Sequence, residues 1–327
     1  MERYRLSVAM CTYNGARFLG EQLESIASQT RLPDELVVCD DCSTDGSAEI
    51  LKSFVRHSPF DVRLEINENN LGSTKNFEKA ISICQGEVIA LADQDDIWYP
   101  SRLKVTESAF RNNPLVGAVF ADADVVDEAL NPLGYRLWEV ALFSRAQKRL
   151  FAAGRPFEAL LAHNVVTGAT LAFRSKYLPL VCPIPSEWVH DGWIAILIAG
   201  VDAVLPIKIP VIKYRQHSEQ QLGARKRDLL SRISNTQTVQ NQKRYLQMPI
   251  EYRAVFERFS LRLGDDSQSR LTLLKNKIEH LECCAALPKS HLLRVPRITA
   301  EFMRNRYSEY GYGWRGAVRD LLVNLDH

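Results

Sequence analysis

The chain has 327 residues, 46% of them hydrophobic and 24% charged, with a formal net charge of +2. This composition is typical of a globular protein with a sizeable core, and it excludes disordered and fibrous chains. The charge is uneven: residues 225–327 hold 19 Lys and Arg against 11 Asp and Glu, whereas residues 1–224 hold 22 against 28. We therefore expect two domains, residues 1–224 and a basic helical region, 225–327, that contacts an acceptor, a membrane or another copy.

We find neither the pattern of a membrane span nor that of a secretory signal in the sequence. The longest apolar region, residues 192–212, is interrupted by Asp202 and Lys208, so it lacks the roughly 20 uninterrupted apolar residues of a membrane span. No long apolar run follows the first charged residues, and the cysteines number seven, with Cys39 and Cys42 as a lone C-x-x-C pair. We expect a reducing, cytoplasmic location, with peripheral contact at the inner face of the cell membrane.

Strand and helix patterns alternate through the first half of the chain. Short apolar runs at 6–11, 35–41, 62–67 and 88–93 alternate with helical periodicity at 16–29, 46–57 and 73–84. Further strands are expected at 117–126 and 167–174, with helices at 155–163 and 191–200 and a proline-bearing extended segment, an edge strand or a bent one, at 203–217. The pattern predicts an α/β fold: a Rossmann-like, mostly parallel central sheet flanked by helices, followed by the helical region.

Polar side chains follow three of these strands. The segments are CTYNG (11–15), DDCSTDGS (40–47) and DQDD (93–96). Ligands of parallel sheets bind at the carboxyl ends of the strands, and this layout suits a nucleotide. No G-x-G-x-x-G or G-x-x-x-x-G-K-[ST] loop is present to hold its phosphates. Clustered acids repel one another and hold a diphosphate only through a divalent cation, so we expect Mg²⁺ or Mn²⁺.

Several ordered motifs resemble a known family, the nucleotide-sugar glycosyltransferases of family 2, which are inverting enzymes of the GT-A fold. The motifs are VAMCTYNGARFLGEQLESIASQT, LVVCDDCSTDGS, NNLGSTKNFEKAI, LADQDDIWYPSRL and HDGW, within residues 6–223. The ending YRQH…GA and the Arg- and Tyr-rich tail are most similar to the rhamnosyltransferase-type subgroup, which builds bacterial surface polysaccharides. Two positions depart from the family pattern: Cys42 replaces a glycine, and His190 replaces an acid.

The resemblance implies a role for individual residues. Asp95 of the D-x-D motif would bind the metal and Asp93 would face the ribose and the metal, while Asp191 would be the catalytic base. His217 is also assigned to the metal, because a neutral imidazole can complete its coordination; a structural role is the alternative. The residues implied at the nucleotide are Thr12, Tyr13, Asn14, Asp41, Lys75, Asp93 and Gln94.

The chemistry of sugar transfer makes the same demands. A metal stabilises the leaving diphosphate, and a carboxylate takes the proton of the acceptor hydroxyl. We expect transfer of a sugar, with rhamnose favoured, from a dTDP- or UDP-sugar to a glycan or lipid-linked glycan acceptor. Two alternatives stay open: a non-catalytic nucleotide-sugar-binding partner of a membrane glycan assembly, and a metal-dependent nucleotidyltransferase. Asp191 alone could equally be a helix N-cap.

The basic tail has two interpretations. Residues 292–322 interleave Arg with Tyr, Trp, Phe and Leu, which suits an amphipathic segment beside anionic lipid. A solvated charged face is the simpler alternative. No nucleic-acid-binding motif accompanies the positive charge, so nucleic acid is not an expected partner, whereas a homo-oligomer is.

Overall fold

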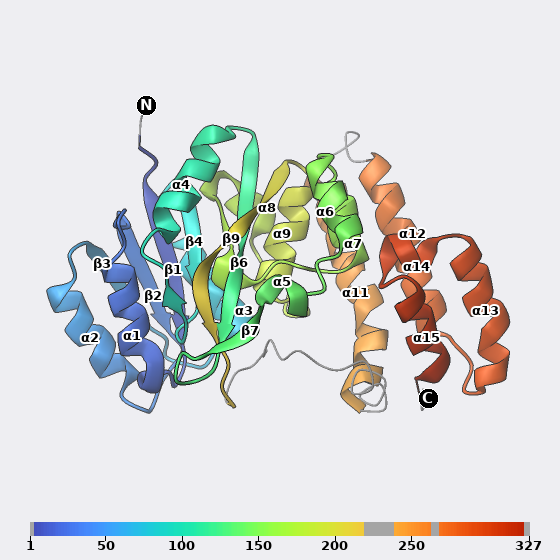
Figure 1. Ribbon diagram of the computed structural model, residues 1–327, viewed down its shortest axis with the longest axis horizontal. Coiled ribbons are helices and arrows are strands. Elements are labelled where there is room, and N and C mark those ends of the chain that lie inside the picture. Colours follow the sequence, from blue (N-terminus) through green and yellow to red (C-terminus); the bar gives the residue numbers. More distant parts are fainter. Residues whose placement is uncertain (1–2, 219–238, 263–267, 324–327) are drawn as a thin grey trace. The chain divides into compact units, whose positions relative to one another are not determined.

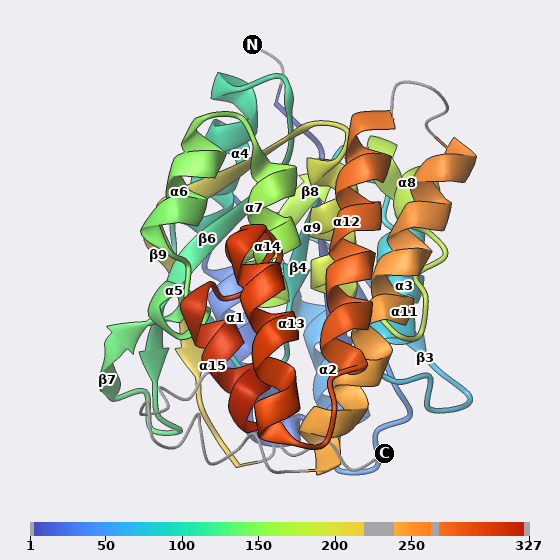
Figure 2. The same ribbon diagram turned by 90° about the vertical axis from the view of Figure 1, so that its right-hand side faces the viewer.

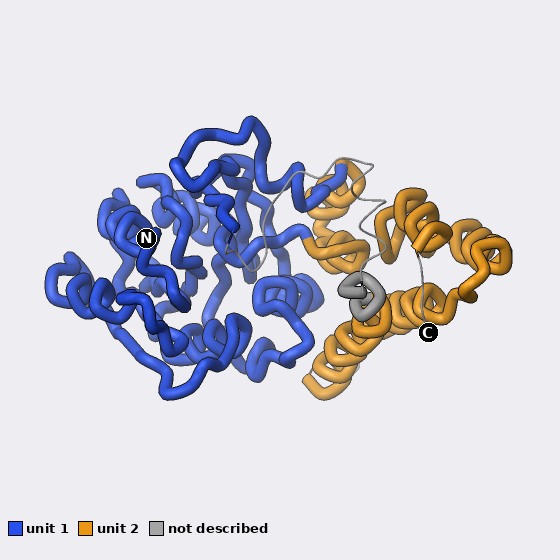
Figure 3. The backbone as a smooth tube through the Cα atoms, turned by 90° about the horizontal axis from the view of Figure 1, so that it is seen from below, with its two compact units in different colours: residues 1–144, 165–225 blue, residues 145–164, 226–327 orange. Residues whose placement is uncertain are grey.

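The structure is a computed structural model and describes residues 3–218, 239–262 and 268–323. It divides into two compact units: residues 1–144 with 165–225, and residues 145–164 with 226–327 (Figure 3). The expected domain boundary between residues 224 and 225 lies outside the described residues and stays a prediction. Residues 145–164 group with the second unit, although the sequence pattern placed them within the first domain.

A single sheet organises the first unit (Figure 1). Among the described residues its strands are β1 (Leu6–Thr12), β2 (Glu35–Asp40), β3 (Asp61–Ile66), β4 (Val88–Ala92), β5 (Ile97–Trp98), β6 (Val116–Val126), β7 (Pro132–Arg136), β8 (Ala172–Arg174) and β9 (Ala203–Arg215). Their order is β3-β2-β1-β4-β8-β6-β9-β5, and β7 pairs with β6. Strands β1 to β4 are mutually parallel, β6 is parallel to β9, and β8 runs antiparallel to both of its neighbours. The predicted mostly parallel sheet is confirmed.

Helices connect and cover these strands. They are α1 (Ala16–Ala27), α2 (Ser47–His57), α3 (Ser73–Ser82), α4 (Arg102–Asn112), α5 (Leu137–Val140), α8 (Leu178–Val181) and α9 (His190–Ala199), with short 3₁₀ turns at Gly168–Thr170 and Ser175–Tyr177. Helix α9 differs from the amphipathic α1 and α3, because it is apolar on every face and buried along nearly its whole length. Its first turn therefore enters the interior of the unit and carries Asp191 with it.

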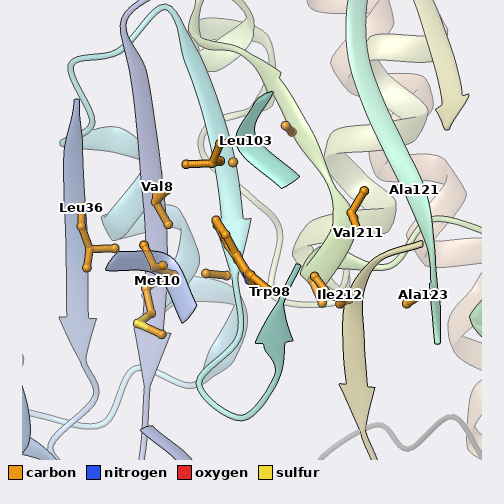
Figure 4. Close-up of a cluster of buried hydrophobic side chains, with 14 of the residues drawn as sticks. Val8, Met10, Leu36, Trp98, Leu103, Ala121, Ala123, Val211 and Ile212 are labelled. Carbon is orange, nitrogen blue, oxygen red and sulfur yellow. The ribbon is translucent and has the colours of Figure 1, made fainter. Parts of the chain in front are cut away.

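The main core lies against one face of the sheet. Alternate residues of β1 point to the same side, so Val8 and Met10 pack in one cluster with Leu36 of β2 and Trp98 of β5 (Figure 4). Leu103 at the start of α4 joins the same cluster. The core thus anchors the strands whose carboxyl ends carry the polar segments.

Strand β9 is irregular, and within the described residues the part of it that carries the prolines pairs with one strand only, β6. It lies between β6 and β5, and its register against β6 shifts on both sides of the pairing between Asp122 and Pro210. Proline cannot donate a ladder hydrogen bond, which accounts for the irregularity at this place. Residues 203–211 therefore lie at an edge of the pairing, and β5 pairs with β9 only at Ile212 and Lys213.

The described part of the second unit is helical, as predicted for the C-terminal region. Its helices are α6 (Arg145–Ala152), α7 (Pro156–Ala162), α11 (Val239–Arg262), α12 (Gln268–Ala285), α13 (His291–Met303), α14 (Arg306–Tyr310) and α15 (Trp314–Leu322). Helices α11 and α12 lie side by side (Figure 2). None of the described helices is both long enough and apolar enough to cross a membrane.

Candidate active site

A cavity of about 310 Å³ opens in the first unit where the expected polar segments meet. The ends of β1, β2 and β4 contribute Thr12, Asp41 and the acidic loop at residues 93–95. Asp191 at the start of α9 and His217, just after β9, also line it. Because the strands are parallel, their carboxyl ends meet at one edge of the sheet, as the sequence pattern required.

The acidic loop after β4 holds more negative charge than the protein around it neutralises. Burial, followed by the neighbouring charges of Asp95 and Asp191, raises the pKa of Asp93 to about 7. Burial also raises the pKa of Asp96 well above its usual range, and the Asp95 and Asp93 charges add to the effect. Arg102 supplies one buried positive charge, held 3.5 Å from the Trp98 ring centre and bonded to the carbonyl of Leu91 at 2.6 Å.

Residues at and just after the end of β9 contact this loop. His217 Nε2 lies 2.7 Å from Asp95 Oδ2, and the main-chain N–H of Arg215 donates to Asp96 Oδ1 at 3.1 Å. The buried Arg215 guanidinium donates to the carbonyl of Asp95 at 2.8 Å and to Glu21. Residues from three distant segments thus hold the acids in place.

The same atoms fit a divalent cation that a diphosphate would help to hold. No group of three His, Cys, Asp or Glu side chains among the described residues is arranged as a complete metal site. Mg²⁺ and Mn²⁺ commonly use only one or two protein carboxylates and take phosphate oxygens for the rest. Asp95 and His217 would offer two ligands beside Asp93, whose pKa is raised first by burial and then by the neighbouring charges of Asp95 and Asp191.

Asp191 is fixed in the cavity by backbone donors. The Gly168 N–H donates to Oδ2 at 2.8 Å, and the Gly192 N–H donates to Oδ1. Burial raises the Asp191 pKa to about 6, while these two hydrogen bonds act in the opposite direction. A Cβ at position 168 would lie 2.8 Å from His190 Nε2, so glycine is needed there for the backbone to approach. The carboxylate is oriented and has a pKa suited to a general base near neutral pH.

His190 is a buried imidazole on the wall of the cavity. Its ring stacks on Phe77 with centroids 3.9 Å apart, and neither ring nitrogen has a hydrogen-bond partner within the described structure. Burial lowers the pKa of His190 to about 3, so the ring is neutral. Unpaired buried nitrogens are costly, and a ligand hydroxyl in the cavity would satisfy one of them. From the sequence, His190 stood out only as a replacement for an acid of the family pattern.

Besides Asp93, four of the residues expected at the nucleotide line the cavity. Tyr13 is half exposed and lines the cavity. The Gln94 amide is bonded to the main chain of Tyr13 on both sides, at 2.8 and 3.1 Å. Thr12 donates to Asp40 at 2.6 Å. The carboxylate of Asp41 accepts three N–H bonds from residues 67–72, each 2.8 Å long. Asp41 and Gln94 therefore shape the loops as well as lining the cavity.

Two further expected residues do not line the cavity. Asn14 joins two loops, accepting from the Thr44 N–H at 2.9 Å through its side chain. Lys75 pairs with Glu78 at 2.7 Å and donates to the carbonyl of Ile184 at 2.6 Å. Their nucleotide contacts stay a prediction from the resemblance, with no support from this geometry.

Sequence reasoning missed Arg102 and Arg215, the two buried cations of the acidic loop. Arg215 belongs to the quoted YRQH segment, and a lone Arg at the end of an apolar strand was an available signal. Arg102 belongs to the quoted LADQDDIWYPSRL segment, but its position at the start of a helix gave no sign that it would be buried.

The chain was compared with known proteins. Residues 7–177, just over half of the chain, match the family described as glycosyl transferase family 2. The chain belongs to glycosyl transferase family 2. The match covers the acidic loop and ends before Asp191 and His217.

Individual family 2 relatives match over shorter stretches. A protein of Nostoc sp. (strain PCC 7120), named as an uncharacterized glycosyltransferase, is 32% identical over 123 residues, 38% of each chain. The dTDP-rhamnosyl transferase RfbG of Shigella flexneri is 34% identical over 99 residues, which cover 29% of this chain and 34% of its own. The chain spans between 34% and 59% of the length of the curated relatives it matches.

Solved structures share the fold of this family 2 chain. A mannosyltransferase from Pyrobaculum calidifontis, in complex with GDP-Man and Mn²⁺, has a TM-score of 0.55 at 17% identity, covering 97% of this chain and 79% of its own. TarS 1-349 of S. aureus, in complex with UDP-GlcNAc, has a TM-score of 0.52 at 15% identity, covering 97% and 90%. The GT-A fold expected from the sequence is confirmed.

Proposed function

We propose that the protein is a metal-dependent, inverting glycosyltransferase that moves a sugar from a nucleotide-diphosphate donor to a hydroxyl of a glycan acceptor. The observation that carries this proposal is the placement of Asp191 in the same cavity as the acidic loop of β4. One carboxylate is held for proton transfer, and a separate cluster attracts a cation and its diphosphate. A family 2 chain that only bound nucleotide sugars would have no use for the oriented Asp191.

Asp191 acts as the general base. It takes the proton of the acceptor hydroxyl while that oxygen attacks the anomeric carbon and the bond from this carbon to the diphosphate breaks. One displacement inverts the anomeric centre, and no enzyme nucleophile is required. The Gly168 and Gly192 N–H groups keep the carboxylate oriented during this step.

Asp95, Asp93 and His217 hold the metal-diphosphate side of the donor. A bound Mg²⁺ or Mn²⁺ would supply Lewis-acid stabilisation of the leaving diphosphate. Mn²⁺ in the Pyrobaculum complex supports this assignment by analogy. Arg215 and Glu21 position the loop, so that Asp95 points to the cavity rather than away from it.

The donor is a dTDP-sugar, with rhamnose as the favoured sugar. The similarity to RfbG, a dTDP-rhamnosyl transferase, supports this choice, as does the resemblance of the YRQH segment to the rhamnosyltransferase-type subgroup. A UDP-hexose is the competing donor. The acceptor is a growing surface polysaccharide, free or lipid-linked.

Titration calorimetry tests the donor site directly. The full chain is titrated with dTDP and with UDP, each with Mn²⁺, with Mg²⁺ and with EDTA. The proposal expects metal-dependent binding, tighter for dTDP. Binding that is unchanged by EDTA would contradict the metal assignment, and tighter binding of UDP would exchange the donor class.

The released product tests the reaction class. Incubation with a dTDP-sugar and an acceptor should release dTDP, and NMR of the new linkage should show the inverted anomer. Release of pyrophosphate from a nucleoside triphosphate would identify a nucleotidyltransferase instead.

A further inference from the structure

Helix α13 of the second unit exposes its apolar side chains. Leu292 and Met303 are 83% and 82% exposed, and Leu293 is 65% exposed. Val295 and Phe302 are also exposed, with Pro296 between them. At 100° per residue, Leu292, Pro296 and Met303 fall on one stripe that points away from the helical unit. We call the side chains of Leu292, Leu293, Val295, Pro296, Phe302 and Met303 the α13 outer face.

Two charged side chains of α13, Arg294 and Glu301, point inward instead. Arg294 is fully buried and donates to the carbonyls of Pro288 at 2.6 Å and Asp320 at 3.1 Å, and also to that of Val323. A guanidinium in this position donates to carbonyls at the end of α15, where a helix leaves carbonyl groups without intrahelical partners. Rotating α13 to bury its apolar stripe would break all of these bonds.

Glu301 fixes the same orientation about two turns further on. It is 3% exposed and lies 2.7 Å from His280 Nδ1, and Arg306 approaches its other oxygen at 3.3 Å. Breaking a buried, hydrogen-bonded charge pair is strongly unfavourable. The apolar outer face is therefore a fixed feature of the folded unit.

The neighbouring α15 has the same inverted arrangement. Asp320 is fully buried and accepts from the hydroxyls of Tyr245 and Tyr307. Trp314 and Leu322 are exposed at 57% and 39%. Figure 2 shows α15 beside α13. Each of these two adjacent helices thus buries a charged side chain and exposes large apolar ones, which a helix facing water rarely does.

The charges around the α13 outer face select its occupant. Lys289, Arg297 and Arg304 are exposed before, within and after the helix, and the only acid between residues 289 and 304 is the buried Glu301. Residues 225–327 carry an excess of eight positive charges, so a second copy would meet like charge. Apolar side chains flanked by Arg and Lys match the acyl and headgroup layers of an anionic bilayer.

We propose that the α13 outer face docks on the surface of an anionic lipid bilayer, with Leu292 and Met303 inserted among the acyl chains. The helix lies in the plane of the interface rather than crossing it. This inference rests on the second unit alone and is independent of the proposed transferase activity. Docking there would bring the chain to the surface on which lipid-linked acceptors are held.

Vesicle co-sedimentation of the full chain tests the proposal. Vesicles of phosphatidylcholine alone are compared with vesicles containing 30% phosphatidylglycerol (roughly the anionic fraction that makes such electrostatics measurable), at low and high salt. The parent protein should sediment with the anionic vesicles only, and less so at high salt. The affinity of the double variant Leu292→Ser/Met303→Ser for the anionic vesicles should be at least about tenfold lower than that of the parent.

A matched control separates this face from general stickiness. Leu246→Ser/Leu261→Ser removes two exposed leucines of α11 in the same unit, where Leu261 is 81% exposed. This control should bind vesicles like the parent, and both variants should keep the parent's circular dichroism and dTDP affinity.

Three results would overturn the proposal. They are equal vesicle binding by the two double variants, no binding of the parent protein to anionic vesicles, and a dimer in sedimentation velocity that Leu292→Ser/Met303→Ser abolishes. The last would assign the face to a second copy. If the parent protein binds anionic vesicles but does not bind dTDP, the proposed transferase function is contradicted and the lipid docking is not.

Discussion

His217 Nε2 lies 2.7 Å from Asp95 Oδ2, although 122 residues separate the two side chains in the chain. The pair joins the loop after β4 to the residues after β9, and it lines the cavity together with Asp93. A histidine so placed either binds the metal or orients the carboxylate that does.

Replacing His217 with alanine should weaken Mn²⁺-dependent dTDP binding by roughly tenfold to 100-fold. The carboxylate of Asp95 would lose its partner and the metal one ligand. Calorimetric titration measures the change, and His57→Ala, at an exposed helix end, is the control. Equal affinity in His217→Ala and the parent would remove His217 from the donor site.

The rate of transfer should rise with pH through about 6. The base works in its ionised form, and burial raises the pKa of Asp191 to about 6, so a larger fraction is active above that pH. Asp191→Asn should lower the rate by about 10²-fold or more and abolish this acid limb, while dTDP binding stays close to that of the parent. A rate profile measured from pH 5 to 8 checks both; transfer by Asp191→Asn at the parent rate would show that another group is the base.

Asp93→Asn should stabilise the metal-free protein at pH 8. Burial first, and then the charges of Asp95 and Asp191, raises the folded-state pKa of Asp93 to about 7, whereas it is about 4 in an unfolded chain. The folded state then binds more protons between these values, and the free energy of unfolding falls as pH rises from about 4 to about 7. The variant removes this loss.

Thermal unfolding in EDTA at pH 5 and pH 8 measures the difference. We expect a gain of about 1–2 kcal/mol for Asp93→Asn at pH 8 and a smaller one at pH 5. Asp61→Asn, at an exposed position of β3, is the control for the loss of one charge. A gain of the same size at both pH values would mean that ionisation of Asp93 is not its cause.

His190→Phe should separate binding of the sugar from binding of the nucleotide. The substitution keeps a ring stacked on Phe77 and removes two buried nitrogens that have no partner among the described residues. We expect an unchanged or higher Tm, because the unpaired groups are gone, and several-fold weaker binding of a dTDP-sugar relative to dTDP itself. A lower Tm with equal loss for both ligands would show that His190 only packs.

Prediction from the sequence succeeded where a local pattern carried the information. The run of apolar residues at 88–92 followed directly by acids predicted a buried strand ending at a ligand site, and β4 and its loop have that form. The apolar content of residues 191–200 predicted a helix there, and α9 is observed at His190–Ala199. It is buried on all sides, which explains why its sequence is apolar throughout. The prolines of β9 predicted an edge or a bent strand, but not its place in the sheet order between β6 and β5.

What the sequence by itself determined was the alternation of strands and helices, and with it the edge of the sheet at which Thr12, Asp41 and Asp93 meet. What only the tertiary structure decided was which distant residues reach that edge. Arg215 and His217 reach that edge because the strand order places the end of β9 there, and His190 reaches it at the start of α9. Asn14 and Lys75 instead bond to Thr44 and Glu78, away from the cavity. The reason is physical: periodicity reports which face of an element is buried, but hydrogen bonds between residues more than 100 positions apart depend on how the elements pack.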